Sequence, residues 1–509
     1  MWLVLQLGRT NKLGKGRIVV PERMPIQGAI SRRLFVRASA LASLALTTRA
    51  QPKNVAQKNL KSGPSGRTAY KHERPPVIMI VLDTVRADHT SAWGYKRHTT
   101  PQLEKFAEHA TRYTQAVAPA PWTLPSHASL FTGLYPFEHN ARTRLLRTSN
   151  GELSVTEPPL EEKAVTIAEI LRANGYSTGA FIANTGFMHE RFNLCQGFQK
   201  YDVDWQPGTT TADKGLEWID QQSRQPFFAF FNFMDAHWPY NTHSVPGVGD
   251  FDVSRDTHLQ RTLLKETMPG SNKVDPSLVD KVTRQYDLGI ANVDAAWGHL
   301  LQGLKERNVY DEAIVVVTSD HGEFLGEHHL VAHSKDVYQP TAWIPLLFKR
   351  PGQRTPEISK DRASLCMVPS LILSQFSDQA LGQIPRHFLQ NAMAEKPILC
   401  ENYYSRKWDF THKLWGHRFK RRRTALYDGS IKFIHSSDGA HEVYDLAADA
   451  DESENLAQKR PDLVDTLTAR LCKFKPLDTQ DKPLESDEEP MQLPADLAEE
   501  MQALGYLGD

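Results

Sequence analysis

Short apolar runs alternate with amphipathic segments along the middle of the chain. The apolar runs are rich in β-branched or aromatic residues, as strands buried on both faces are, and lie at 77–82, 177–183, 227–233 and 313–318, with a further strand at 344–348. Segments with apolar residues at helical spacing lie between them, at 101–109, 161–174 and 286–304. This alternation predicts an α/β fold, with a large mostly parallel sheet sandwiched by helices, over residues 74–389.

The pattern changes after about residue 390. Short strand candidates with turns between them occur at 397–399, 424–427, 431–434 and 442–444, and a helix candidate follows at 461–472. They predict a small C-terminal antiparallel-sheet subdomain over residues 390–475. Residues 476–509 are interpreted as an acidic tail and terminal segment.

The N-terminal region has the features of an export signal. Residues 31–35 read Ser-Arg-Arg-Leu-Phe, a twin-arginine pattern, and a short apolar run follows at 38–46. We therefore interpret residues 1–50 as a twin-arginine-type signal region and 51–73 as a linker, which predicts export to the periplasm or the extracellular space. The alternative is a disordered basic tail in a cytoplasmic protein. No other stretch is apolar enough to cross a membrane.

Composition narrows the function classes. The 60 basic and 60 acidic residues give a formal net charge of zero, which argues against nucleic-acid binding as the main function. The four cysteines lack the close spacing of a zinc site. They allow at most two disulfides, and free buried thiols are the alternative.

Acidic and imidazole groups follow three of the predicted strands. Asp83 ends the first, Asp235 and His237 follow the aromatic strand, and Asp320 and His321 follow the strand at 313–318. In parallel sheets the ligand site lies beyond the carboxyl ends of the strands, so we expect these groups to converge.

Their chemistry suits a metal-activated hydroxyl. Asp83, Asp320 and His321, with the hydroxyl of Thr123, would hold one divalent cation that turns Thr123 into a nucleophile. His237 and His333 could then stabilise charge or protonate a leaving group, and Lys335 is a candidate anion contact. Each of these residues has an ordinary structural alternative, such as a helix cap or a surface histidine. A second metal at Asp235, His237 and His333 is a further alternative.

The predicted nucleophile lies in a Pro-rich turn at 120–133. Ser126 is predicted to cap a helix that begins at His127 and ends at Gly133. The basic run 420–423 is predicted to be a solvated strand edge. Asp287 and Asp294, seven residues apart on one predicted helix, are predicted to be structural.

These residues together resemble the sulfatases of the alkaline-phosphatase-like superfamily of metal-dependent hydrolases. The matching motifs are 81–89, 94–95, 123–127 with 132–136, 235–240, 319–323 with 326–328, 444–446 with 454–456, and 503–508. The resemblance covers nearly all of residues 74–509. It implies a metal at Asp83, Asp320 and His321, a nucleophile at residue 123, and substrate or leaving-group contacts from His237 and His333. It also implies Ca²⁺ as the family default, with Mn²⁺ or Zn²⁺ as alternatives.

The chain departs from the sulfatase pattern at three positions. Sulfatases carry Cys or Ser, converted to formylglycine, at the start of a Cys-x-Pro-Ser-Arg motif, whereas this chain has Thr123 there and His127 in place of the Arg. Thr84 stands where a second aspartate is common. We therefore expect no formylglycine, and we assign His127 to substrate binding. A threonine ester must be cleaved by water or an acceptor alcohol, which is easier for phosphoryl than for sulfuryl esters.

The sequence thus predicts an exported sulfatase-family hydrolase that cleaves sulfate or phosph(on)ate esters with a metal-activated Thr123. Its expected partner is an anionic ester substrate, not a nucleic acid, and its oligomeric state stays open. One alternative is a Thr-dependent phosphodiesterase or phospho-headgroup transferase acting on a glycan or lipid. Another is a non-catalytic anion-binding relative.

Overall fold

The computed structural model describes residues 74–222, 225–240, 253, 256–270, 274–377, 381–382, 384–390, 397–477 and 483–485. They belong to one compact unit, Arg67–Asp509. The predicted signal region, the linker and nearly all of the predicted tail lie outside the described residues. None of the helices in the described ranges is both long and apolar enough to span a bilayer.

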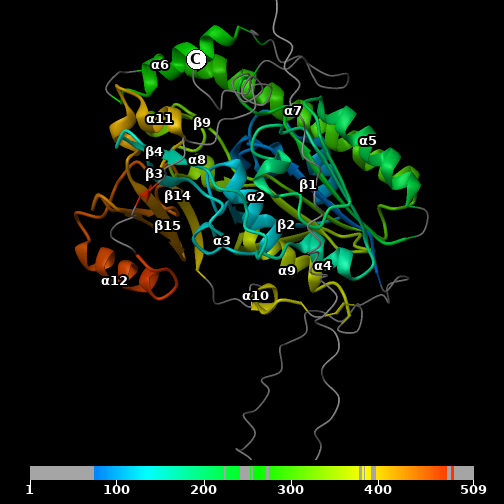
Figure 1. The fold of residues 1–509 in the computed structure, drawn as a ribbon. Helices are drawn as coiled ribbons and strands as arrows, with labels where there is room; N and C mark the ends of the chain where they lie inside the picture. The colour runs from blue at the N-terminus through cyan, green and yellow to red at the C-terminus, as the bar shows by residue number, and fades with distance from the viewer. Residues whose placement is uncertain are drawn as a thin grey trace, which may run out of the picture. The chain divides into compact units, whose positions relative to one another are not determined.

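A 9-stranded sheet forms the centre of the unit (Figure 1). Its order is β11-β2-β12-β8-β1-β7-β5-β6, and β13 pairs with β2. The parallel part consists of β1 (Val77–Leu82), β5 (Ser177–Ile182), β6 (Lys200–Val203), β7 (Phe227–Phe233) and β8 (Ile314–Thr318). The predicted large, mostly parallel sheet is therefore confirmed.

The other side of the sheet is mixed and was largely missed by the sequence pattern. It contains β2 (Thr111–Val117), β11 (Trp343–Ile344), β12 (Leu346–Lys349) and β13 (Glu357–Ser364). Strand β12 runs antiparallel to β8, and β13 runs parallel to β2. The predicted single strand at 344–348 is divided at Pro345, which has no N–H to donate to a neighbouring strand.

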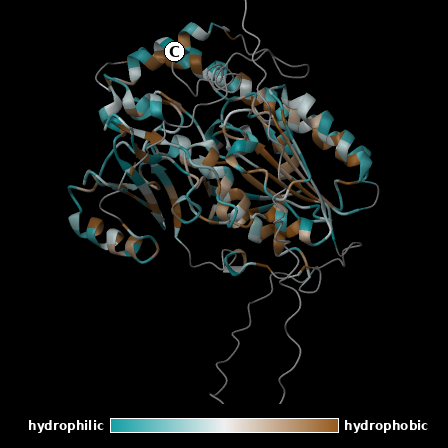
Figure 2. Ribbon diagram, viewed as in Figure 1, coloured by the Kyte–Doolittle hydropathy of each residue, from teal (hydrophilic) through white to brown (hydrophobic). Residues whose placement is uncertain are grey.

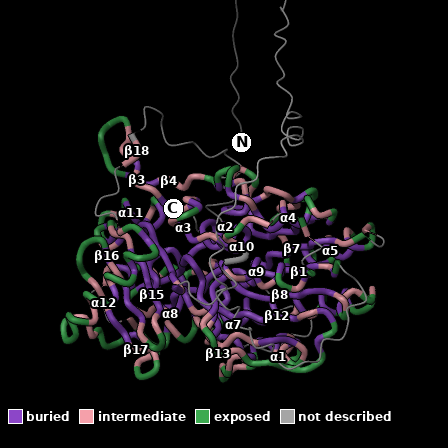
Figure 3. The backbone as a smooth tube through the Cα atoms, turned by 90° about the horizontal axis from the view of Figure 1, so that it is seen from below, coloured by how far each residue is buried: buried purple, intermediate pink, exposed green. Residues whose placement is uncertain are grey.

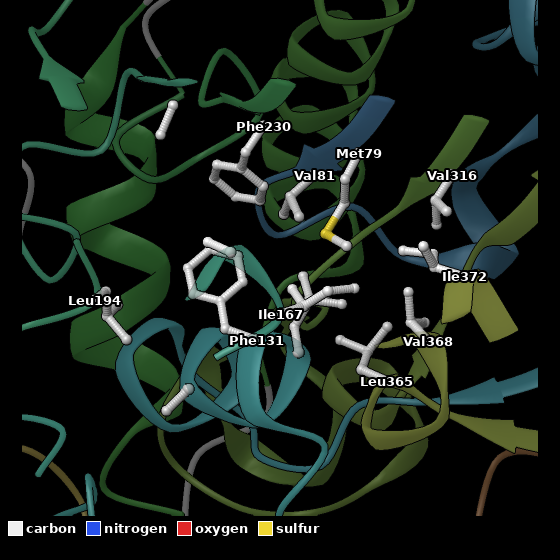
Figure 4. Packing of buried hydrophobic residues seen from close by; sticks show 14 of the residues in the cluster. Met79, Val81, Phe131, Ile167, Leu194, Phe230, Val316, Leu365, Val368 and Ile372 are labelled. Atoms are coloured by element: carbon white, nitrogen blue, oxygen red, sulfur yellow. The ribbon is translucent and has the colours of Figure 1, made fainter. Parts of the chain in front are cut away.

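Helices cover both faces of the sheet because successive side chains of a strand point to opposite faces. Met79 and Val81 of β1 pack with α2 (Thr123–Thr132), α4 (Ile167–Ala173) and α9 (Val368–Leu373) (Figure 4). Ile78 and Ile80 pack with α1 (Pro101–Ala107), α5 (Gly208–Gln221) and α7 (Pro276–Glu306). The central strands of the sheet are apolar in Figure 2, and β1, β7 and β8 are buried in Figure 3.

Three predicted helix boundaries were wrong. Helix α4 begins at Ile167, not 161, because Thr166 caps it and exchanges hydrogen bonds with Glu169. Helix α7 begins at Pro276, ten residues before the predicted start at 286, with Asp275 as its cap. Ser126 is not a cap, since α2 already begins at Thr123 after the extended residue Trp122. Pro125 is tolerated there because N–H groups of a first helical turn need no intrahelical partner.

The predicted C-terminal sheet is confirmed as a 4-stranded antiparallel sheet. It consists of β14 (Ile398–Tyr403), β15 (Arg422–Asp428), β16 (Ile431–Ser436) and β17 (Glu442–Asp445), and α12 (Pro461–Cys472) packs on it. The remaining elements are β3 (Arg144–Arg147), β4 (Leu153–Thr156), β9 (Phe324–Leu325), β10 (Val331–Ala332), β18 (Leu484–Glu485), α3 (Pro136–His139), α6 (Thr257–Thr267), α8 (Gln339–Ala342), α10 (Arg386–Gln390) and α11 (Lys407–Thr411).

The basic run 420–423 was predicted to be a solvated strand edge. That prediction was wrong for its last residue, Arg423. Strand β15 lies between β14 and β16, and Arg423 is 1% exposed and pairs with Glu442 at 2.7 Å. A central strand has one face against the rest of the protein, which buries this guanidinium. The four cysteines are all free thiols, which was the alternative to disulfides.

Candidate functional site

The predicted strand-end residues come together at one edge of the sheet. Asp83 directly follows β1, and Asp320 and His321 follow its parallel neighbour β8. All three side chains are fully buried, and one possible ligand atom of each lies within 4.8 Å of the others. Within the described ranges this is the one group of three such side chains.

Two asparagines that the sequence analysis missed orient Asp83. Asn184, after β5, and Asn232, in β7, both donate to Oδ2 of Asp83, at 2.9 and 3.0 Å. Oδ1 of Asp83 is buried, and no described residue forms a hydrogen bond with it. Burial, reinforced by the neighbouring Asp320, raises the pKa of Asp83 to about 7.

The second carboxylate is held by backbone N–H groups. Oδ1 of Asp320 accepts from Thr84, at 3.2 Å, and from His321, at 2.9 Å, while Oδ2 lies 3.2 Å from Nε2 of His321. Burial alone would raise the pKa of Asp320, but the charge of His321 outweighs it and lowers that pKa to about 2. At His321 burial alone would lower the pKa, but the charge of Asp320 outweighs it and raises that pKa to about 9.

The donor set fits a divalent cation. Nδ1 of His321 donates to the carbonyl of Gly322, at 2.9 Å, so Nε2 is the ring nitrogen directed at Asp320 and at Thr123 Oγ1, which is 3.5 Å away. In the described part of the chain, Oδ1 of Asp83 is buried without a hydrogen-bond partner, and Oδ2 of Asp320 is buried beside Nε2 of His321. Two such carboxylates beside a single imidazole leave negative charge that a metal ion would neutralise.

Thr123 is presented by the first turn of α2. The helix is tied to the end of β8 because the hydroxyl of Ser126 donates to the carbonyl of Asp320 at 2.6 Å. This contact replaces the predicted capping role of Ser126. It fixes the distance between the hydroxyl of Thr123 and the strand-end group.

His127 follows the candidate nucleophile Thr123 by one turn of α2. Its side chain is fully buried, its Nδ1 donates to the carbonyl of Thr123 at 3.0 Å, and the same nitrogen is 3.6 Å from Oδ2 of Asp320. The ring packs edge-on against Phe131 and Phe230. Burial lowers the pKa of His127. Its contact with substrate stays a prediction, whereas the structure gives it contacts to both Thr123 and Asp320.

The two other predicted histidines join His321 in a row. The ring of His333 lies 4.7 Å from that of His321 and 4.9 Å from that of His237. Burial lowers the pKa of His237 to about 3 and that of His333 well below its usual value, so both rings are neutral. Glu323, also missed, holds Nδ1 of His333 at 3.0 Å. Its position in the motif after β8 was the available signal.

Lys335 is anchored by the C-terminal part of the chain. Its ammonium group is buried against Asp409 of α11, and Ser405 donates to the same carboxylate at 2.9 Å. Burial lowers the pKa of Lys335 to about 8. No local sequence signal indicated Asp409, because it lies 74 residues from Lys335.

Asp235 is directed elsewhere. Its carboxylate accepts a hydrogen bond from the N–H of Gly208, the first residue of α5, at 3.1 Å. It therefore contacts the start of a helix and does not belong to the group formed by Asp83, Asp320 and His321. Asp287 pairs with His89 and Arg97, and Asp294 accepts from two N–H groups at the start of α1. The structural roles predicted for Asp287 and Asp294 are confirmed.

The chain matches known proteins over most of its length. A family model described as Sulfatase matches residues 75–377. Arylsulfatase K of Bos taurus is 22% identical over 78% of this chain and 81% of its own, and choline-sulfatase of Rhizobium meliloti is 22% identical over 78% and 85%. The crystal structure of phosphonate monoester hydrolase of Agrobacterium radiobacter aligns with a TM-score of 0.57 and 19% identity, covering 83% of this chain and 100% of that one. The predicted resemblance to the sulfatase family is therefore confirmed.

Proposed function

Because the chain belongs to the sulfatase family, we propose that it is a metal-dependent hydrolase that cleaves sulfate or phosph(on)ate esters with Thr123 as nucleophile. One observation carries this proposal: the buried hydroxyl of Thr123 lies 3.5 Å from His321, beside the carboxylates of Asp83 and Asp320. The similar proteins are named both as sulfatases and as a phosphonate monoester hydrolase, so both ester chemistries occur among them.

Asp83, Asp320, His321 and Thr123 would hold the cation. When bound, it supplies positive charge that lowers the pKa of the Thr123 hydroxyl and offsets the charge of the ester. Ca²⁺ is the family default, and the imidazole in the donor set also suits Mn²⁺ or Zn²⁺.

The residues of the chain supply the remaining steps. Thr123 Oγ1 forms a bond to the sulfur or phosphorus as the bond to the leaving-group oxygen breaks. His333 is neutral and held through Nδ1 by Glu323, so its Nε2 can accept the proton of Thr123 and return it to the leaving group. Lys335 and His237 would contact the anionic group, and His127 would keep the backbone of Thr123 in place.

A threonine ester leaves two outcomes for the second step. It lacks the additional hydroxyl of a formylglycine hydrate, so water or an acceptor alcohol must cleave it. Thr123 therefore favours phosph(on)ate substrates and keeps phospho-headgroup transfer as the second candidate function. Product analysis with and without an acceptor alcohol separates transfer from hydrolysis.

The central test is Thr123→Ala with Thr123→Ser as its matched control. Turnover of a panel of aryl sulfate, phosphate monoester, phosphate diester and phosphonate should be abolished in the first variant and partly retained in the second. Metal content should persist in both, since Asp83, Asp320 and His321 remain. Undiminished turnover in Thr123→Ala would contradict the nucleophile, and purified protein without metal would favour a non-catalytic relative. Export rests on residues 31–35 and is tested by locating the protein after cell fractionation.

A further inference from the structure

His333 and Lys335, two residues of the proposed mechanism, are carried by a short hairpin. Its strands are β9 and β10, which pair over two residues each, and Glu327–Leu330 forms the turn between them. Two residues per strand supply little pairing energy, so a hairpin of this size needs contacts from the rest of the protein. Residues 324–335 are called the site hairpin below.

The turn of the site hairpin has an unfavourable backbone conformation for its residues. The N–H of Leu330 donates to the carbonyl of Glu327 at 2.9 Å, and the central residues His328 and His329 have φ of 53° and 55°. Positive φ at both central positions is the requirement of a type I′ turn, in which Asn and Gly are the usual residues. The Cβ of a histidine crowds the backbone in this region, so the turn costs free energy and needs an outside contact to hold it.

The guanidinium group of Arg418 binds both central carbonyls of this turn. It donates from Nη1 to the carbonyl of His329 at 3.0 Å and from Nη2 to the carbonyl of His328 at 3.3 Å. Nη1 also donates to the carbonyl of Met268, just after α6, at 2.5 Å. Arg418 itself lies on the short helix Gly416–Phe419. One side chain therefore ties the turn to the end of α6 and to the C-terminal part of the chain.

The open end of the site hairpin carries the reacting histidine. Glu323 precedes β9 and His333 follows β10, so their contact at 3.0 Å closes the hairpin opposite the turn. The next residues are held separately: the N–H of Ser334 donates to the carbonyl of Pro121 at 2.8 Å, and Lys335 is anchored by Asp409. A change at the turn is therefore passed along β10 to His333, whereas Lys335 keeps its own anchor.

We propose that Arg418 is a positioning residue for the reaction: it holds the turn in its unfavourable conformation and thereby keeps His333 in register with Glu323. This inference rests on the proposed function, in which His333 takes the proton of Thr123. Arg418 acts through the hairpin and not on the substrate, because its hydrogen bonds within the described ranges all go to main-chain carbonyls. It does for this turn what a glycine does in an ordinary type I′ turn.

Kinetics of the metal-loaded variants Arg418→Gln and Arg418→Gln/His329→Gly test the inference. The single variant should lower kcat about tenfold to a hundredfold, as expected for a small displacement of a proton-transferring group. It should leave KM within about twofold, because Lys335 keeps its anchor. The side chain of His329 is exposed, and glycine adopts positive φ without strain, so the double variant should recover most of the loss.

Two control positions lie at the C-terminal end of α7. Arg307→Gln removes a guanidinium that also donates to a main-chain carbonyl, that of Gly303 at 3.2 Å, and should leave kcat unchanged. Asn308→Gly places glycine at another position of positive φ, 56°, and should not rescue Arg418→Gln. Equal rescue by both glycines would reveal a general gain in stability and overturn the inference. An unchanged kcat in Arg418→Gln, or a loss that His329→Gly does not recover, would overturn it too.

Hydrogen exchange supplies a readout that needs no turnover. The N–H groups of Gly326 and Leu330 are bonded within the hairpin, to the carbonyls of Leu330 and Glu327. In Arg418→Gln they should exchange about tenfold to a hundredfold faster, as expected for the loss of a charged hydrogen bond, and His329→Gly should slow them again. Unchanged exchange would contradict the role of Arg418. Failure of the proposed function looks different, since Thr123→Ala would then keep full turnover while the exchange rates still responded.

Discussion

Buried charges are arranged differently in two regions. One is the strand-end site, with Asp83, Asp320 and His321. The other is the C-terminal sheet with its buried ion pairs, here called the junction. At the junction, Lys432 pairs with Glu452 at 2.6 Å with both side chains fully buried, and Arg423 pairs with Glu442. At the site, Asp83 and Asp320 lie beside His321, and Asp320 also lies 3.6 Å from the imidazole of His127, so no lysine or arginine of the described site group pairs with them. Full pairing serves structure, whereas the excess negative charge at the site suits an external cation.

The difference indicates which buried charges belong to a candidate binding site. A buried carboxylate with its own lysine or arginine needs nothing further, as at Glu452. The carboxylate of Asp83 is held instead by the amide groups of Asn184 and Asn232, which supply no positive charge, so a bound cation would complete it.

The largest expected effect is on catalysis at the site. Asp83→Asn should lower turnover by at least about a hundredfold, because a metal contributes several kcal/mol to the transition state. The metal-free variant should be no less stable than the metal-free wild type, because a desolvated carboxylate has been removed. Activity assays and thermal unfolding with a chelator measure both. A variant that loses activity only because it unfolds would contradict the comparison.

At the junction the effect should be on stability instead. Glu452→Gln should cost about 3–5 kcal/mol of unfolding free energy, since it leaves Lys432 buried without its partner. Adding Lys432→Met should recover part of that loss. Denaturant unfolding measures both changes, and they should not depend on metal. The exposed pair of Glu454 and Lys459 supplies the control, and Glu454→Gln should have little effect.

Adding metal should stabilise the wild type selectively. A ligand at a hundredfold excess over its Kd stabilises the folded state by about 2.7 kcal/mol. Thermal unfolding of the wild type should shift upward with Mn²⁺, Ca²⁺ or Zn²⁺, whereas Asp83→Asn should shift little. Equal shifts in the two proteins would place the cation outside the strand-end group.

A smaller effect on stability is expected at His139, a buried residue that belongs neither to the strand-end site nor to the junction. Burial lowers its pKa to about 3, and its Nδ1 accepts from the N–H of Ala141 at 3.1 Å, so the folded state keeps it neutral. The unfolded chain binds a proton below pH about 6.5, so stability should fall as pH drops from there toward 3, by about 1.4 kcal/mol per pH unit. Unfolding at pH 6 and 5 measures the slope, and His139→Gln should flatten it.

The sequence pattern predicted the central parallel strands well and the mixed side poorly. Strands β1, β7 and β8 are apolar throughout because both faces are covered, so their composition alone identified them. Strands β2 and β13 carry many polar residues, and only pairing with each other and with β12 makes them strands. The start of α2 was misplaced because Pro125 and Ser126 looked like a turn and a cap.

By itself the sequence determined the family, the parallel part of the sheet and three residues whose side chains meet at its edge. Asp83, Asp320 and His321 were predictable because strand order and direction bring strand ends together without knowledge of side-chain packing. Only the tertiary structure decided what holds them: Asn184, Asn232, Glu323 and Asp409 come from distant parts of the chain. Such contacts depend on packing between elements, which leaves no local pattern.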